Sequence, residues 1–265
     1  MERYVIRGGR QGYDRLRVLA RSWAETTSAL LDTVGVHSGM TCLDLGCGAG
    51  DVTFELARRV GPEGRVVGVD LDEVKLGLAR DEAARAGLTN VAFEVGNVHD
   101  RTEADAYDVV YSRNVLQHLT DPVGVLRAMW AAVRAGGVLV AEDADFSGVF
   151  AEPPNPGVDF WLETYSQTLR RNGGDPLSGR QLHRRFVAAG IPAPALTVVQ
   201  RLDRVTEAKA MPRLTVEATA EAVIQAGAAT PEQIDAAIES LVAYESDPDT
   251  IIGSPRLFQA WSRRA

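Results

Sequence analysis

A glycine-rich turn between two apolar segments constrains the fold of this chain more than any other feature. Residues 41–45 form a short apolar run typical of a buried strand, and three glycines follow in the segment LDLGCGAG at 43–50. Residues 51–60 then show the apolar spacing of a helix. Glycines let a ligand approach the backbone closely, and the first turn of a helix offers unpaired N–H groups. The segment therefore predicts a strand, a ligand-binding turn and a helix.

The same alternation of strand and helix patterns continues along the chain. Strands are predicted at 65–70, 91–95, 107–111 and 138–141, and helices at 13–34, 72–87 and 122–134. Strands separated by helices of about 10–15 residues favour βαβ units and a mostly parallel sheet. We therefore expect an α/β fold.

Beyond residue 145 the pattern is less regular. Three prolines within 152–157 predict a loop, because proline lacks the N–H group that regular structure needs. The remaining predicted elements are helices at 158–171, 178–189, 213–226 and 231–246, and strands at 197–205 and 256–263. These segments predict helices added to one α/β core rather than a second independent domain.

Composition and charge exclude several classes of protein. The formal net charge is −8 over 265 residues, and an acidic chain repels the phosphate backbone of nucleic acids. No apolar run approaches the roughly 20 residues that span a bilayer, and no secretory signal follows Met1. Two cysteines are too few for a disulfide framework, which predicts a reducing, cytoplasmic location. Six arginines within 3–21 resemble a transit peptide, but we interpret them as a solvated face of the first helix.

The spacing of the three glycines bears on the ligand. A dinucleotide site has its third glycine at the position that Asp51 occupies here, and a carboxylate there would oppose a pyrophosphate on the helix end. Asp44, just before the turn, suits a positively charged ligand. Asp70, at the end of the next strand, can accept hydrogen bonds from the ribose hydroxyls of either kind of nucleotide. These residues disfavour a dinucleotide without excluding it.

Taken together, the motifs of the chain resemble those of class I S-adenosylmethionine-dependent methyltransferases. The turn at 43–50 resembles their motif I, Asp70 matches the acid after their second strand, and 107–122 resembles their fourth-strand motif. Residues 134–140 are similar to their turn into strand five. The resemblance covers 36–145 closely and is nearest to small-molecule enzymes of the ubiquinone-biosynthesis and secondary-metabolite types. It implies a Rossmann-like, doubly wound, mostly parallel seven-stranded sheet with an antiparallel last strand, plus added helices forming a lid.

The resemblance also implies a cofactor and the residues that bind it. The cofactor would be S-adenosyl-L-methionine, with S-adenosyl-L-homocysteine as its product. The family usually has aspartate where this chain has Asn97, whose amide oxygen can still accept a hydrogen bond from the adenine amine. The expected cofactor-binding residues are Tyr4, Asp44, Gly46, Cys47, Gly48, Gly50, Asp70, Leu71, Asn97, Val98, Ser112, Arg113 and Asn114.

Aromatic residues beyond the fifth strand are candidates for acceptor binding. Five of the seventeen aromatic residues fall within 146–165. They either form an apolar wall for an acceptor or pack the added helices onto the core. The candidate substrate-binding residues are Phe146, Phe150, Trp161 and Tyr165.

An oxygen or nitrogen acceptor of high pKa would need a nearby base. His118 is the leading catalytic candidate, because an unperturbed histidine pKa near 6.5 lets the ring take a proton at neutral pH. Glu142 and Asp143 are the other candidates near the strand ends. The alternative is that His118 only packs beneath the lid or orients the substrate. The four histidines show no metal-ligand spacing, so no metal is expected.

These expectations assign a part to every segment of the chain. The parts are an N-terminal flap and helix (1–35), a cofactor-binding core (36–145), a lid or acceptor-binding insertion (146–180), continued core (181–205), a helical insertion (206–250) and the last core strand (251–265). The predicted reaction is methyl transfer from S-adenosylmethionine to an O, N or C atom of a small molecule. No nucleic acid or membrane partner is expected, and a homodimer is a candidate assembly. The alternatives are an NAD-dependent oxidoreductase on a related sheet and a non-catalytic S-adenosylmethionine-binding protein.

Overall fold

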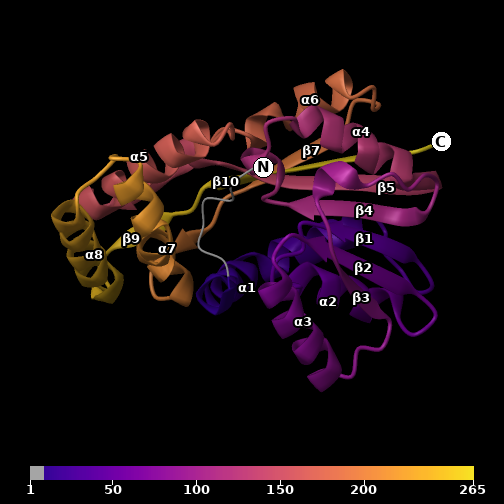
Figure 1. Ribbon diagram of the computed structural model, residues 1–265, viewed down its shortest axis with the longest axis horizontal. Helices are drawn as coiled ribbons and strands as arrows, with labels where there is room; N and C mark the ends of the chain where they lie inside the picture. The colour runs from indigo at the N-terminus through magenta and orange to yellow at the C-terminus, as the bar shows by residue number, and fades with distance from the viewer. Residues whose placement is uncertain (1–8) are drawn as a thin grey trace.

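Seven strands form the central sheet of the protein, in the order β3-β2-β1-β4-β5-β10-β7 (Figure 1). The computed structural model describes residues 9–265, so the predicted Tyr4 lies outside the described residues. The strands are β1 (Thr41–Leu45), β2 (Arg65–Asp70), β3 (Val91–Val95), β4 (Tyr107–Arg113), β5 (Val133–Asp145), β7 (Ala195–Val199) and β10 (Arg256–Arg263). β10 runs antiparallel to β5 and β7, while the pairs from β3 to β5 are parallel. The predicted Rossmann-like sheet with an antiparallel last strand is confirmed.

Helices cover both faces of this sheet, as a parallel sheet requires. The flanking helices are α1 (Gly9–Thr33), α2 (Asp51–Val60), α3 (Glu73–Arg85), α4 (Pro122–Ala132) and α6 (Leu182–Ala188). One apolar cluster joins α4 and α6 to one face, and a second joins α1 and α2 to the other. A smaller cluster packs α3 against Phe54 and Phe93, beside the edge strand β3. Most side chains of β1 and β4 are buried because both faces of these central strands are covered.

The ends of these helices follow local capping chemistry. The carboxylate of Asp72 accepts hydrogen bonds from two backbone N–H groups in the first turn of α3. Asp121 caps α4 in the same way, and Pro122 occupies a first-turn position where no N–H donor is needed. The short 3₁₀ helices are η1 (Val98–Asp100), η2 (Leu116–His118), η3 (Phe146–Gly148), η4 (Gly179–Gln181) and η5 (Glu207–Ala210). These caps fix where α3 begins after β2 and where α4 begins after β4, at the edge of the sheet that forms the site.

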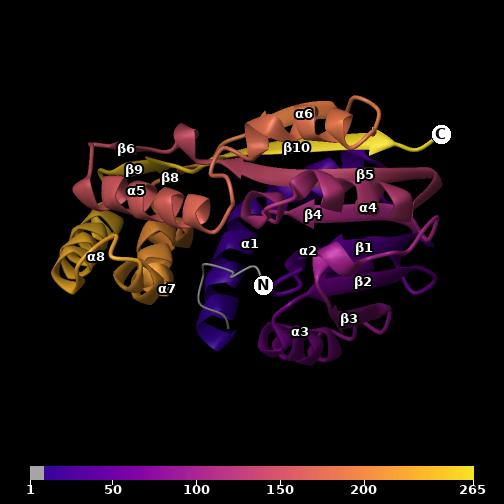
Figure 2. The same cartoon turned by 45° about the horizontal axis from the view of Figure 1, so that its top comes forward.

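A helical lobe, defined here as residues 146–171 and 201–254, lies beyond one end of the sheet (Figure 2). It contains α5 (Pro156–Arg171), α7 (Met211–Gln225), α8 (Pro231–Ser246) and a small antiparallel sheet of β6 (Phe150–Glu152), β9 (Ile251–Gly253) and β8 (Leu202–Asp203). The lobe has an apolar cluster of its own, which includes Val158, Trp161, Tyr165, Leu169, Val216, Val223, Ile234, Leu241, Tyr244 and Ile252. The lobe therefore packs around its own core as well as against the sheet.

Three of the predicted elements differ in the structure, two of them because of the second sheet. The strand expected at 197–205 divides into β7 in the large sheet and β8 in the small one. Part of the segment expected to form only the last core strand, 251–265, is β9 of the small sheet. The turn into strand five expected within 134–140 lies inside β5, because Tyr107 of β4 pairs with Val133 ahead of a shift in register. Strands of two or three residues carry no alternation long enough to be recognised in the sequence.

Two arginines of α1 differ from the expected solvated face, because Arg15 is buried and Arg17 is partly buried, whereas Arg21 is exposed. Arg17 forms ion pairs with Asp51 (2.5 Å) and Glu82 (2.8 Å), and Arg21 pairs with Glu207 of η5. Both views place α1 between the lobe and the helices α2 and α3, which these ion pairs connect (Figures 1 and 2). None of the helices within residues 9–265 is both long enough and apolar enough to cross a membrane.

Candidate active site

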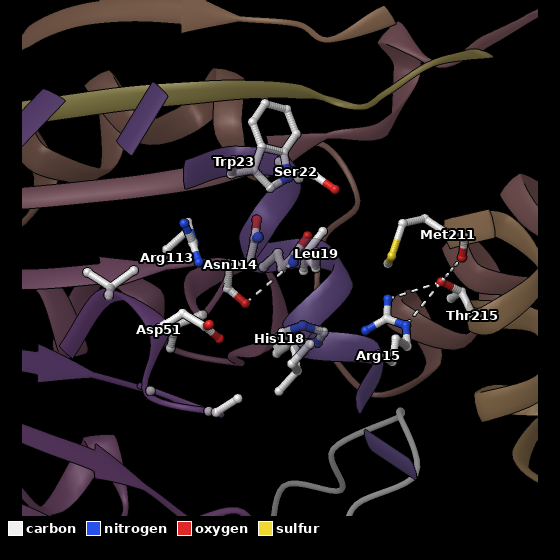
Figure 3. A pocket seen from close by; sticks show the side chains of 18 of the residues that line it. Arg15, Leu19, Ser22, Trp23, Asp51, Arg113, Asn114, His118, Met211 and Thr215 are labelled. Atoms are coloured by element: carbon white, nitrogen blue, oxygen red, sulfur yellow. Dashed lines mark hydrogen bonds between the residues drawn. The ribbon is translucent and has the colours of Figure 1, made fainter. Parts of the chain in front are cut away.

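A cavity of about 620 Å³ lies at the carboxyl ends of β1, β2, β3 and β4. Ligands of open α/β sheets bind at this edge, where the strand order reverses, here between β1 and β4. We call the part lined by the strand ends the turn half. The part lined by α1, α5, η5, α7 and the segment before β10 is the lobe half (Figure 3). The volume is typical of a small-molecule site.

The turn half is built around the glycines that follow β1. The N–H groups of Gly46 and Cys47 both donate to the carbonyl oxygen of Val69, which ties the turn to β2. A Cβ atom on Gly46 would come within 2.3 Å of a Val115 methyl group, and one on Gly48 within 2.9 Å of Leu16. Both glycines also have positive φ angles, which side chains rarely allow. Gly50 has the same conformation but precedes α2 behind the turn and is not part of the lining.

Two carboxylates flank this turn. One oxygen of Asp70 accepts from the Gly48 N–H (2.9 Å) and the other from the Asp72 N–H (3.0 Å). These bonds hold the side chain at the cavity wall, and each oxygen can accept a further hydrogen bond. Asp44 is only 2% exposed and accepts from the Thr53 hydroxyl (2.7 Å). Burial raises the pKa of Asp44 to about 6. Both predicted acids therefore line the cavity.

The remaining residues of this half come from the ends of β2 and β3. Asn97 accepts a hydrogen bond from the His99 N–H (3.1 Å) and so caps η1, with its side chain on the cavity wall. Leu71 and Val98 line the same wall. Burial raises the pKa of the Cys47 thiol well above its usual range, which keeps that group protonated. The structure brings these sequence-predicted residues together.

The end of β4 adds an unusual backbone conformation. Asn114 has φ +56°, a left-handed value that is uncommon outside glycine and that clusters at functional sites. Within residues 12–265, the amide oxygens of Asn114 and Gln117 are buried and accept no hydrogen bond. Arg113 lines the cavity and donates to Thr27 (2.9 Å). Ser112 is buried behind the cavity and is not part of its lining.

His118 lies in the cavity wall with an altered titration. In the view of Figure 3 its ring lies between Asn114 and Arg15. Burial, with smaller effects from the cations of Arg15 and Lys75, lowers the pKa of His118 to about 3. This value differs from the pKa near 6.5 that the sequence suggested, because a lone histidine in a sequence says nothing of its burial. The ring is therefore neutral at physiological pH.

The other two candidate bases do not face the cavity. Glu142 accepts from the side chains of Tyr111, Gln259 (2.7 Å) and Thr27 (3.3 Å), beneath α1. Asp143 points to the opposite face of β5, where it accepts from the Ser178 hydroxyl (2.7 Å). Burial raises the pKa of Asp143 to about 7. Neither carboxylate is part of the lining, so their assignment as candidate bases is corrected.

Aromatic side chains from the lobe form part of the other half. Phe146 packs edge-on against Trp161 (ring centroids 6.0 Å apart) and lies 5.0 Å from the Tyr165 ring, and all three line the cavity. Phe150 does not: its side chain is 42% exposed on β6, where it covers Gly253. Its position argues against the substrate-binding role expected of it.

Most of the lobe half was missed by sequence reasoning. Its other lining residues are Arg15, Leu16, Leu19, Ser22, Trp23, Arg201, Asp203, Ala208, Met211, Pro212, Thr215, Ile252, Ser254, Pro255 and Leu257. Only α1 carried a signal, since Arg15, Leu19 and Ser22 recur at the spacing of one helical face. The others come from segments whose meeting depends on the tertiary fold.

Comparison with known families decides what kind of protein has this fold and cavity. The model of a family described as methyltransferase domain matches residues 36–172, just over half of the chain. The chain belongs to this methyltransferase family. Its sheet and its glycine turn are those of the class I S-adenosylmethionine-dependent methyltransferases, as the sequence motifs indicated.

Individual relatives are more distant. A 37.1 kDa protein of unknown function from a Streptomyces fradiae transposon is 31% identical over 68% of this chain and 52% of its own length. A demethylmenaquinone methyltransferase of Listeria monocytogenes is 29% identical over 60% of this chain and 64% of its own. The chain thus spans between half and two thirds of the length of these curated relatives. A crystal structure of a proposed methyltransferase from Bacillus halodurans shares the fold, with a TM-score of 0.61 and 16% identity over 89% of this chain and 97% of its own.

Proposed function

We propose that this chain transfers the methyl group of S-adenosylmethionine to an O, N or C atom of a small-molecule acceptor. The observation that carries the proposal is the single continuous cavity in which a glycine turn with two acids meets an aromatic wall. A cofactor in the turn half and an acceptor in the lobe half would then lie in contact. The name of the demethylmenaquinone methyltransferase among the relatives supports a small, partly apolar acceptor.

The residues of the turn half fit S-adenosylmethionine. Asp70 offers acceptor oxygens for the two ribose hydroxyls, and the Asn97 amide oxygen offers one for the adenine amine. Asp44 and the buried, unpartnered amide oxygens of Asn114 and Gln117 suit the cationic amino-acid end. When bound, S-adenosylmethionine supplies a methyl group already activated by its sulfonium.

The contribution we assign to the protein is orientation and exclusion of water. An in-line displacement on an activated methyl group needs no covalent catalysis by the protein, so positioning the acceptor atom accounts for much of the acceleration. The lobe half, walled by Phe146, Trp161 and Tyr165, holds the acceptor against the turn half and keeps solvent away. We propose that neutral His118 orients the acceptor there rather than removing its proton, because its lowered pKa makes it a weak base.

A calorimetric titration tests the ligand. S-adenosylmethionine, S-adenosylhomocysteine and NAD are titrated separately into the protein, and we expect the two adenosyl ligands to bind and NAD to bind far more weakly. Asp51 in the first turn of α2 supports this order, since its carboxylate would repel a pyrophosphate at that helix end. Tight NAD binding without S-adenosylmethionine binding would favour the oxidoreductase alternative.

A transfer assay then tests turnover. Methyl-labelled S-adenosylmethionine is incubated with the protein and a panel of phenols, quinols, amines and carbon acids, and labelled product is separated from cofactor. We expect transfer to at least one oxygen, nitrogen or carbon acceptor. Cofactor binding without transfer to any member would support the non-catalytic alternative.

A further inference from the structure

Arg15 presents a buried guanidinium to the lobe half of the cavity. The residue is 8% exposed, lines the cavity and projects from α1 toward α7 (Figure 3). Its Nε and Nη2 atoms both donate to the Thr215 hydroxyl, at 3.2 and 3.0 Å. An arginine is charged at every physiological pH, so this is a buried positive charge beside the space where the acceptor would lie.

The charge of Arg15 is not balanced by a carboxylate within the described chain. The other cations of the lining have one nearby: Lys75 lies 3.5 Å from Asp72, and Arg201 lies 3.3 Å from Asp203. Arg113 is surrounded by the negative charges of Asp44, Asp51 and Glu142. Among residues 12–265, no carboxylate lies within ion-pair distance of Arg15. Buried charges in proteins are normally paired, so the missing anion points to a ligand.

The hydrogen bonds of Arg15 leave a defined set of donors. A guanidinium has five N–H groups, and Thr215 takes one from Nε and one from Nη2. Thr215 is fixed as an acceptor because its own hydrogen is donated to the Met211 carbonyl oxygen (2.7 Å). Three donors on Nη1 and Nη2 remain, and two of them form a parallel pair that matches the oxygens of a carboxylate or phosphate.

Apolar side chains form much of the wall around Arg15, together with the ion-paired Arg201 and Asp203. Phe146, Tyr165, Met211 and Pro212 line the same half of the cavity. Trp161 is 5% exposed in the same lining, and its indole Nε1 is buried with no acceptor among the described residues. A ligand that satisfied both groups would carry oxygen atoms on an apolar body that packs against the aromatic rings.

Resting on the function proposed above, we propose that the methyl acceptor is a small aromatic acid whose anionic oxygens bind Arg15 and whose rings pack among Phe146, Trp161 and Tyr165. The carboxylate of S-adenosylmethionine is a second source of the same anion. The acceptor is favoured because the two hydrogen bonds to Thr215 hold the Arg15 guanidinium against α7, in the lobe half.

The test compares acids with their neutral amides. Benzoate, 4-hydroxybenzoate and 2-naphthoate, each paired with its primary carboxamide, are titrated into the full chain saturated with S-adenosylhomocysteine. We expect at least one acid to bind about tenfold more tightly than its amide, as a charge-assisted bidentate contact allows. In Arg15→Met this preference disappears, while Arg21→Met, on the same helix but outside the cavity lining, retains it.

Each other outcome overturns the proposal. If no acid in the panel binds the wild-type protein more tightly than its amide does, the site does not select anions. This comparison uses only the wild-type protein, so it does not depend on the folding of a variant. If Arg15→Met weakens S-adenosylhomocysteine more than about tenfold but leaves its decarboxylated analogue unaffected, the anion belongs to the cofactor. Failure of the wild-type protein to bind S-adenosylhomocysteine would instead refute the proposed function itself.

Discussion

The two halves of the cavity are built from different parts of the chain and by different means. The turn half comes from residues 44–118, where each wall lies at the end of a neighbouring parallel strand. Much of its shape is backbone: glycines at positive φ, and N–H groups tied to Asp70 and Val69. The lobe half gathers side chains from α1, α5, α7 and the segment before β10, which lie far apart in sequence.

This difference separates what the fold fixes from what it leaves variable. A site shaped by main chain tolerates few substitutions, since a Cβ atom at Gly46 or Gly48 would collide with its neighbours. A site shaped by side chains on packed helices can change its ligand while the helices keep their positions. Under the proposed function, the turn half binds the cofactor that the family shares, and the lobe half selects the acceptor of this particular chain.

The largest effect is expected in the turn half, at Asp70. Asp70→Ala removes the acceptor for two ribose hydroxyls, and charge-assisted hydrogen bonds contribute about 1.5–3 kcal/mol each. We expect the affinity for S-adenosylmethionine, measured by calorimetry, to fall at least about tenfold while circular dichroism shows the fold retained. Asp81→Ala is the matched control, because Asp81 lies on the exposed surface of α3. Equal affinities for Asp70→Ala and the wild type would refute the assignment.

In the lobe half, Trp161→Ala is expected to act on the acceptor alone. Removing this ring deletes an apolar wall, so the KM of an acceptor identified by the transfer assay should rise about tenfold, with the Kd of the cofactor nearly unchanged. Tyr165→Ala should behave in the same way. Trp130→Ala, which removes the same ring from the α4 side of the sheet, serves as the control. Loss of both affinities together with a lower Tm would mean that the aromatic residues only pack the lobe.

The pH dependence distinguishes two of the titratable groups that line the cavity, Asp44 and His118. The raised pKa of Asp44, about 6, means that its negative charge is lost as the pH falls from 7 to 5. Affinity for the cationic S-adenosylmethionine should fall by up to about tenfold over this range, and Asp44→Asn should flatten the profile. His118, with a pKa of about 3, stays neutral between pH 7 and 5. His118→Asn should therefore show the same fall in cofactor affinity over this range as the wild type, and its rate should be lower by less than about tenfold.

A different pH profile would support His118 as a general base. A rate that rises through pH 5.5–7.5 in the wild type, loses that limb in His118→Asn and falls by about 10²–10⁴ would show proton transfer by the histidine. Calorimetric binding curves at the same pH values separate this case from a change in cofactor affinity.

The smallest effect is expected at Asn97. Asn97→Asp replaces an amide oxygen by a carboxylate, which is a stronger acceptor for the adenine amine and can still cap η1. The cofactor should bind as tightly as before or up to about threefold more tightly, as measured by calorimetry. A large loss would mean that the Asn97 amide donates a hydrogen bond that the ligand needs.

The sequence predicted the turn half far better than the lobe half. The turn at 43–50 carries its own signal, because glycine spacing and the flanking strand are local features. By contrast, nothing in the sequence distinguishes Arg15 from the neighbouring arginines, because its burial depends on α7, some 200 residues away in the chain. Glu142 and Asp143 show the same limit. The sequence predicts them just after the strand at 138–141, but they lie inside the longer β5, where Gln259 and Ser178 donate hydrogen bonds to their side chains.

Three predictions from the sequence are tested neither by the structure nor by the similarity to known proteins. The division into functional domains, homodimer formation and a cytoplasmic location stay predictions from the sequence. Size-exclusion chromatography with light scattering would test the dimer directly.

The lobe is made by two separate excursions of the chain from the sheet. The first, after β5, supplies β6 and α5, and the second, after β7, supplies β8, α7, α8 and β9. Their apolar faces meet in one cluster, so each excursion is complementary to the other rather than to the sheet alone. Recombination between relatives must therefore carry both stretches together. A chimera whose crossover falls between residues 172 and 200 would join mismatched partners, whereas exchange of both stretches would transfer acceptor preference as one heritable unit.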